Sequence, residues 1–102
     1  MKLLNDKQEE IPVNSDIFLG EVEVGTTKDF TFYLYNESKG MSLDIKVEAI
    51  ECNQLEDVKI LEVPQTIDAN TKKAFIVRWI PTLKVEAGLH MTLKVTGKTI
   101  WK

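Results

Sequence analysis

Apolar and polar side chains alternate along four stretches of the chain, residues 27–36, 42–49, 73–80 and 89–95. A period of two is typical of a β-strand that turns one face toward the protein interior and the other toward solvent. The four stretches therefore predict four half-buried strands. The side chains that we expect on their inner faces are all apolar: Phe30, Phe32, Leu34, Leu43, Ile45, Val47, Ala49, Phe75, Val77, Trp79, Leu89, Met91, Leu93 and Val95.

Two weaker strands and a short final one complete the predicted set. Residues 17–24 have strand composition, and residues 58–63 do too until Pro64, which has no N–H to donate to a sheet. Residues 96–98, Thr-Gly-Lys, have the composition of a tight turn, which leaves residues 99–102 as a short final strand. We expect about seven strands, since no stretch is long enough for a stable isolated helix.

The chain of 102 residues has the length of one domain with one hydrophobic core. Strands that follow one another without intervening helices predict an all-β protein. We therefore expect an immunoglobulin-like antiparallel β-sandwich of about seven strands over residues 16–102, with its final strand short. Residues 1–15 are expected to form an N-terminal arm or edge segment, of which the first ten residues are mobile unless a partner orders them.

Two segments near the start carry a family resemblance. Residues 17–25 read Ile-Phe-Leu-Gly-Glu-Val-Glu-Val-Gly, and residues 30–36 read Phe-Thr-Phe-Tyr-Leu-Tyr-Asn. With Phe-Ile-Val-Arg-Trp-Ile-Pro over residues 75–81, this pattern resembles abnormal-spindle/hydin-type immunoglobulin-like domains, which are relatives of the major sperm protein. The resemblance implies a two-sheet sandwich that serves as a non-catalytic scaffolding and docking module in cytoskeletal, ciliary and viral assemblies.

Charge and cysteine content argue against several classes of protein. The chain has 13 basic and 16 acidic residues and a net charge of −3, the wrong sign for neutralising the phosphates of a nucleic acid. Cys52 is the only cysteine, which leaves no intrachain disulfide and no multi-cysteine metal site. No apolar run has the length of a membrane span or of a secretory signal. We therefore expect neither a nucleic-acid nor a membrane partner, and a cytoplasmic location on synthesis.

Candidate catalytic and metal-binding groups are few. His90 is the only histidine and falls on the solvent side of a predicted strand, where Cys52 would meet it only by accident of folding. Glu21 and Glu23 share a strand face and three carboxylates crowd residues 51–57, but neither set has the spacing of a calcium loop. Nucleophilic catalysis needs a base beside the nucleophile. The sequence therefore predicts no enzyme, no cofactor and no metal.

The outer faces of two strands provide a candidate interaction surface. In immunoglobulin order the second and fifth strands, residues 28–36 and 73–80, are antiparallel neighbours whose outward side chains merge. The candidate contact residues are Tyr33, Tyr35, Ile76, Arg78 and Ile80. Tyrosine and arginine are enriched in interface cores, whereas tyrosine opposite a β-branched residue also stabilises a sheet without any partner. An interface and a cross-strand ladder both stay open as interpretations.

A second candidate contact lies at the end of the chain. If residues 99–102 are too short to cover the strand at residues 89–95, unpaired backbone groups are available to an incoming strand. Ile100 and Trp101 are then further candidate contact residues. In the alternative interpretation residues 10–13, which include a proline typical of edge strands, pair at that edge.

These features favour a non-catalytic structural protein that joins a larger assembly, with proteins as its partners, including copies of itself. The first hypothesis is a component of a bacterial virus particle, either a head decoration or a tail accessory protein, made in the cytoplasm and incorporated into the virion. The alternative is a cytoplasmic adaptor or cytoskeletal interaction module that binds a peptide strand of a partner. A fold alone does not decide between them.

Overall fold

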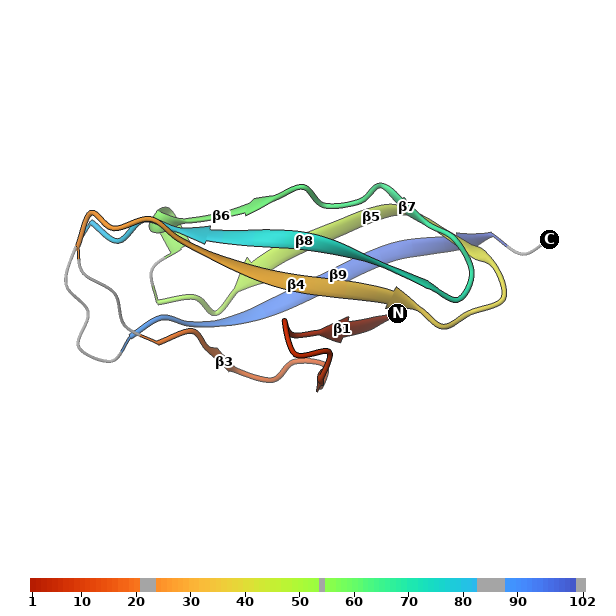
Figure 1. The fold of residues 1–102 in the computed structure, drawn as a ribbon, viewed down its shortest axis with the longest axis horizontal. Helices are drawn as coiled ribbons and strands as arrows, with labels where there is room; N and C mark the ends of the chain where they lie inside the picture. The colour runs from red at the N-terminus through yellow and green to blue at the C-terminus, as the bar shows by residue number, and fades with distance from the viewer. Residues whose placement is uncertain (21–23, 54, 83–87, 101–102) are drawn as a thin grey trace.

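The computed structural model describes residues 1–20, 24–53, 55–82 and 88–100. They form nine strands, rather than about seven, and one turn of 3-10 helix at Leu55–Asp57 (Figure 1). Within these ranges there is no α-helix, and none that is long and apolar enough to cross a membrane. The molecule is elongated, with principal extents of 49 × 21 × 20 Å. The expected all-β class is confirmed.

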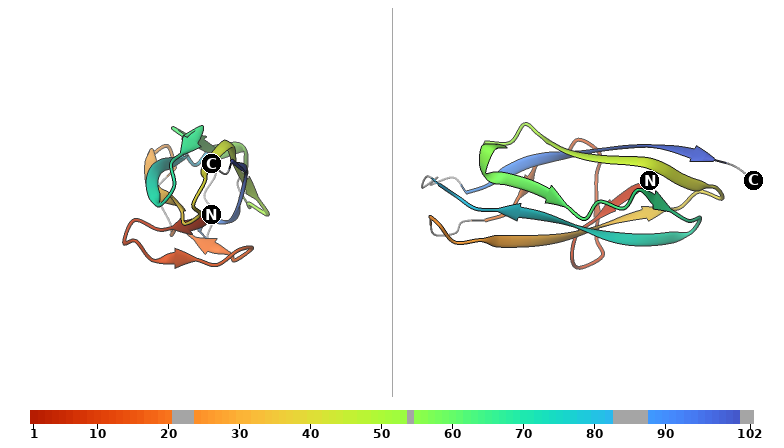
Figure 2. Two further views of the ribbon diagram at one scale, coloured as in Figure 1. Left: turned by 90° about the vertical axis from the view of Figure 1, so that its right-hand side faces the viewer. Right: turned by 90° about the horizontal axis from the view of Figure 1, so that it is seen from above.

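The strands form two antiparallel sheets that lie on each other as two layers (Figure 2). Sheet A has the order β2-β1-β4-β8-β6. Its strands are β1 (Lys2–Leu4), β2 (Glu10–Ile11), β4 (Lys28–Asn36), β6 (Val58–Leu61) and β8 (Thr71–Trp79). Sheet B has the order β3-β9-β5-β7. Its strands are β3 (Ile17–Phe18), β5 (Met41–Ile50), β7 (Thr66–Ile67) and β9 (His90–Ile100).

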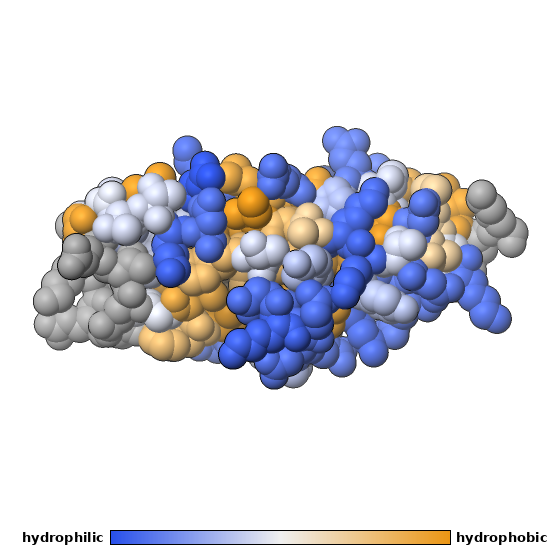
Figure 3. Space-filling view, viewed as in Figure 1, coloured by the Kyte–Doolittle hydropathy of each residue, from blue (hydrophilic) through white to orange (hydrophobic). Residues whose placement is uncertain are grey.

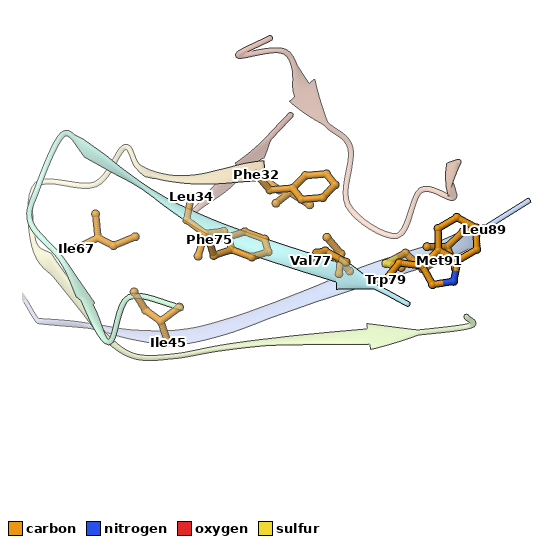
Figure 4. Close-up of a cluster of buried hydrophobic side chains, with 11 residues drawn as sticks. Phe32, Leu34, Ile45, Ile67, Phe75, Val77, Trp79, Leu89 and Met91 are labelled. Carbon is orange, nitrogen blue, oxygen red and sulfur yellow. The ribbon is translucent and has the colours of Figure 1, made fainter. Parts of the chain in front are cut away.

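The hydrophobic core fills the space between the two sheets (Figure 4). Phe32 of β4 lies opposite Phe75 of β8, and the two rings stack with their centroids 5.7 Å apart. The buried apolar side chains are Leu3, Phe32, Leu34, Ile45, Ile67, Phe75, Val77, Trp79, Leu89, Met91 and Leu93. The predicted inner faces of β4 and β8 are therefore confirmed: Phe32, Leu34, Phe75, Val77 and Trp79 are buried, and Phe30 is partly buried against the core.

One predicted inner-face residue, Leu43, does not join the core, because β5 contains a β-bulge. The register between β5 and β9 shifts between Leu43 and Lys46, and Asp44 has a φ of 52°. An additional residue in one strand moves the alternation by one position. Ser42 is therefore buried, at 4% exposure, in the place that Leu43 was expected to fill, and Ile45 is buried after the bulge.

The predicted turn at residues 96–98 and the separate final strand are wrong. β9 continues without a break to Ile100 and pairs with β5 along this length. Gly97 lies opposite the bulge of β5, and a glycine inside a strand often marks such an irregularity. Local turn composition is overridden here by pairing with a long neighbouring strand.

Residues 2–11 form a hairpin at the edge of sheet A. β1 lies between β2 and β4, and Leu3 reaches the core. Glu10 and Ile11 pair with β1, so residues 10–13 do not cover the strand at residues 89–95 as the alternative interpretation expected. That strand instead pairs with β3, the beginning of the predicted strand at residues 17–24. Residues 21–23 of that prediction lie outside the described residues.

The turn at residues 36–40 carries the chain from sheet A to sheet B. The side-chain amide of the buried Asn36 donates hydrogen bonds to the carbonyl oxygens of Gly40, at 2.8 Å, and Ile67, at 2.9 Å. Its Oδ1 accepts from the hydroxyl of Ser38 at 2.6 Å. Gly40 is packed so closely that a Cβ there would overlap the backbone carbonyl of Ile100. Asn36 therefore links the two sheets at this end of the molecule.

Candidate interaction surfaces

The outward side chains of β4 and β8 share one face of sheet A. The two strands pair antiparallel, as the sequence predicted, with Tyr33 opposite Ala74 and Thr31 opposite Ile76. All four side chains are at least partly exposed, whereas the side chains that alternate with them in the middle of the two strands, Phe32, Phe75 and Val77, are buried. The predicted surface thus exists as a continuous arrangement across two strands.

Two leucines that the sequence reasoning did not single out widen this surface. Leu4 of β1 lies beside Tyr33, and Leu61 of β6 lies beside Ile76. Leu61 follows the alternation of β6, but Leu4 lies in a segment that was expected to be an arm. We call the resulting set the sheet A patch: Leu4, Thr31, Tyr33, Leu61, Ala74 and Ile76. Figure 3, which looks onto β4 and β8, shows hydrophobic residues over the middle of this face with hydrophilic residues around them.

Two of the predicted contact residues have partners within the sheet. The Arg78 guanidinium lies opposite Asp29 and donates two hydrogen bonds to its carboxylate, at 2.8 and 3.0 Å. The hydrogen bond from Arg78 lowers the pKa of Asp29, and the same bond raises the pKa of Arg78. The Lys72 ammonium lies 5.7 Å from the ring centroid of Tyr33 and also donates to Gln8. The ladder interpretation therefore holds for Arg78, whose charge is already paired.

The remaining predicted contact residues lie at different places. Tyr35 is on the same face, half-buried and opposite Lys2, near the end of β4. Ile80 follows the last residue of β8 and is 39% exposed beside a shallow hollow of about 200 Å³. Ile100 is 51% exposed at the end of β9, which belongs to sheet B. Trp101 lies outside the described residues.

His90 takes part in a contact that fastens β3 to β9. Its Nδ1 lies 2.7 Å from Oδ2 of Asp16, and its ring centroid is 4.8 Å from that of Phe18. Cys52 is half-buried against the core, and the hydrogen bonds of the described residues do not join it to His90. Among the residues that the structure describes, no cluster of three or more His, Cys, Asp or Glu side chains is placed to hold a metal ion.

A free sheet edge lies along the C-terminal half of β9. β3 pairs with β9 only at Met91 and His90, with further backbone bonds to Leu89. Beyond Met91, no other described strand lies on this side of β9, while β5 occupies the opposite side. A surface hollow of about 500 Å³ follows this edge, and its lining includes Met1, Glu37, Ser42, Val95 and Thr99.

Comparison of the chain with models of protein families, with curated proteins and with solved structures gives no match. The resemblance to abnormal-spindle/hydin-type domains therefore stays a prediction from sequence.

Proposed function

We propose that this chain is a non-catalytic structural module that joins a protein assembly through the sheet A patch. The observation that carries the proposal is the adjacency of Leu4 to Tyr33 and of Leu61 to Ile76. Lysines border these rows, with Lys72 and Lys2 beyond Tyr33 and Lys59 beyond Leu61. An apolar and aromatic centre within a charged rim is the usual arrangement of a protein interface.

The extent of the patch favours an interface over a simple ladder. Cross-strand stabilisation explains pairs such as Tyr33 with Ala74 on the two central strands. Leucines continue the same rows onto β1 and β6, so that the apolar surface spans four strands at positions where polar side chains would also be tolerated. Four neighbouring strands thus supply one surface, and that surface fits a partner protein or a second copy of the chain.

The more specific form of the proposal is a component of a bacterial virus particle with an immunoglobulin-like sandwich, made in the cytoplasm and then incorporated into the virion. Its support is the combination of one small elongated sandwich with an outward apolar patch. The alternative is an adaptor that binds a peptide strand of a partner, and the free edge of β9 favours it. Copy number discriminates between the two: a particle protein occurs in symmetric stoichiometry in purified virions, whereas an adaptor captures one dominant partner.

The test of the patch is the double variant Tyr33→Ser with Ile76→Ser. We expect it to stay folded, with a Tm near that of the parent, and to lose assembly by tenfold or more, about 1.4 kcal/mol or above. Assembly is measured as incorporation into purified particles and as self-association by sedimentation velocity. The matched control, Lys59→Ser with Lys72→Ser, changes the same face at its rim and should assemble like the parent. Unchanged assembly of the patch variant would reduce the surface to a cross-strand ladder.

A further inference from the structure

We propose that the free edge of β9 binds an extended acidic segment of a partner protein as an added β-strand. The inference deepens the adaptor form of the proposed function and rests on the chain having a protein partner. It places this contact on sheet B, away from the sheet A patch. The backbone of β9, the hollow beside it and the charges of its side chains all favour such a partner.

The backbone of β9 offers unused hydrogen-bonding groups on one side. Leu89 directs both its N–H and its C=O toward β3, bonding Gly20 and Leu19 at 3.0 and 2.9 Å. Successive residues of a strand direct these groups to opposite sides, and the bulge lies in β5, so the alternation continues along β9. The residues whose N–H and C=O face the open side are therefore the odd-numbered ones, Leu93, Val95, Gly97 and Thr99. An added strand would pair with β9 on the same side as β3, beyond the point where β3 ends.

The hollow beside this edge contains an unsatisfied polar side chain. Ser42 is 4% exposed, lines the hollow, and has no side-chain hydrogen-bond partner among the described residues. The directly opposite residue, Thr99, and the neighbouring Val95 line the same hollow. Inward side chains of an added strand would enter this space, where a small hydroxyl side chain could bond Ser42.

The charges of β9 select an acidic strand. Residues 88–100 contain Lys94 and Lys98 and no Asp or Glu. Two carboxylates lie near these lysines on β5: Glu48 is opposite Lys94, and Asp44 is 3.8 Å from Lys98. Such exposed pairs are weak, so they leave the lysines available to acidic side chains on a new neighbour.

The charges around the edge also bear on whether a second copy of the chain could be the occupant. The one carboxylate that lines the hollow, Glu37, forms an exposed ion pair with Lys2 at 3.4 Å. A second copy paired through its own β9 about Thr96 would place Lys94 against Lys98, and like charges directly opposite are destabilising. Lysines on a strand edge commonly prevent such self-pairing. The lysines of β9 therefore fit an acidic segment, and they disfavour the register of a second copy that is centred on Thr96.

The test uses two capped octapeptides, one alternating threonine and glutamate and one alternating threonine and lysine. At low ionic strength we expect the acidic peptide to bind at least about tenfold more tightly by isothermal titration calorimetry. Amide exchange measured by NMR gives a second readout. In the free protein the amides of Leu93, Val95, Gly97 and Thr99 should exchange fast and those of the even-numbered residues slowly. The acidic peptide should protect the odd-numbered set alone.

Variants assign the binding to this edge. Lys94→Gln with Lys98→Gln should remove the preference for the acidic peptide. The matched control, Lys59→Gln with Lys72→Gln, removes the same number of positive charges from sheet A. It should keep the preference for the acidic peptide. Ser42→Ala should lower the affinity for the acidic peptide about threefold to tenfold, because one hydrogen bond between the protein and the peptide is lost.

Three outcomes would overturn the inference: equal affinity for the two peptides, protection of sheet A amides in place of those of β9, or concentration-dependent protection of the odd-numbered amides without peptide. The last outcome would identify a second copy of the chain as the occupant. The double variant Tyr33→Ser with Ile76→Ser should bind the acidic peptide normally. The experiments therefore distinguish failure of the proposal about the β9 edge from failure of the proposal about the sheet A patch.

Discussion

The outer faces of the two sheets differ sharply, although the strands that form them follow the same alternation. At the centre of sheet A the outward residues are Tyr33, Ile76 and Leu61. At the centre of sheet B they are polar or charged, with Lys46 and Glu48 of β5 opposite Thr96 and Lys94 of β9. Alternation thus decides which side chains face inward. The identity of the outward side chains decides which partners the surface of each sheet can bind.

The same contrast extends to the way in which each sheet can meet a partner. Sheet A keeps a bidentate charge pair, Arg78 with Asp29, toward one end and leaves its middle apolar, so its contact surface consists of side chains. Sheet B has a solvated face and an incompletely covered strand, so its contact surface is the backbone of β9. One molecule therefore has two surfaces with different chemistry.

The largest expected effect comes from placing the same charge on the two sides of β8. Val77→Asp buries an unpaired carboxylate in the core and should destabilise the protein by more than about 4 kcal/mol, enough to unfold it. Ile76→Asp, one residue away on the outer face, should cost about 1 kcal/mol, mainly through β-propensity. Urea denaturation monitored by circular dichroism measures both. Similar midpoints for the two variants would show that the faces are assigned incorrectly.

The next largest effect is expected at Asn36, whose side-chain hydrogen bonds connect the two sheets. Asn36→Ala leaves the carbonyl oxygens of Gly40 and Ile67 without their amide donor and should cost about 2–3 kcal/mol. The control Ser38→Ala, in the same turn but only partly buried, should cost about 1 kcal/mol or less. Chemical denaturation gives both values, and a cost for Asn36→Ala no larger than that of the control would contradict the role of Asn36.

The smallest effect tests the charge pair of sheet A by its pH dependence. The hydrogen bond from Arg78 lowers the pKa of Asp29 from its ordinary value of 3.8. The unfolded chain therefore takes up this proton at a higher pH than the folded protein does. The stabilisation by the pair is present above pH 3.8 and is lost as the pH falls through the lower pKa of the folded state. The stability difference between the parent and Asp29→Asn should shrink between pH 5 and pH 2, whereas a constant difference would argue against the pair.

Much of the fold could be predicted from local pattern, and the errors occur where pairing partners are distant in sequence. The inner faces of β4 and β8 follow from alternation alone. The position of Leu43 does not, because the bulge at Asp44 depends on the register with β9, about fifty residues away. The composition of residues 96–98 indicates a turn, yet pairing with β5 keeps them extended.

The candidate surfaces show the same division. Tyr33 and Ile76 could be placed on one face because strand order in a sandwich makes their strands neighbours. Leu4 could not be placed there, since nothing near it in the sequence specifies that β1 pairs with β4. The free edge was expected beside a short final strand, and it exists instead because β3 is short and β9 is long.

The length of β9 also has a mechanical consequence. Eleven residues at about 3.3 Å each span roughly 36 Å of the 49 Å long axis, along which β9 runs beside β5 (Figure 1). When the molecule is held at its opposite end, a pull on the end of β9 along this axis loads the hydrogen bonds between the two strands in parallel, as shear. They cannot open one after another like a zipper, so the strand pair resists tension applied along the length of the molecule.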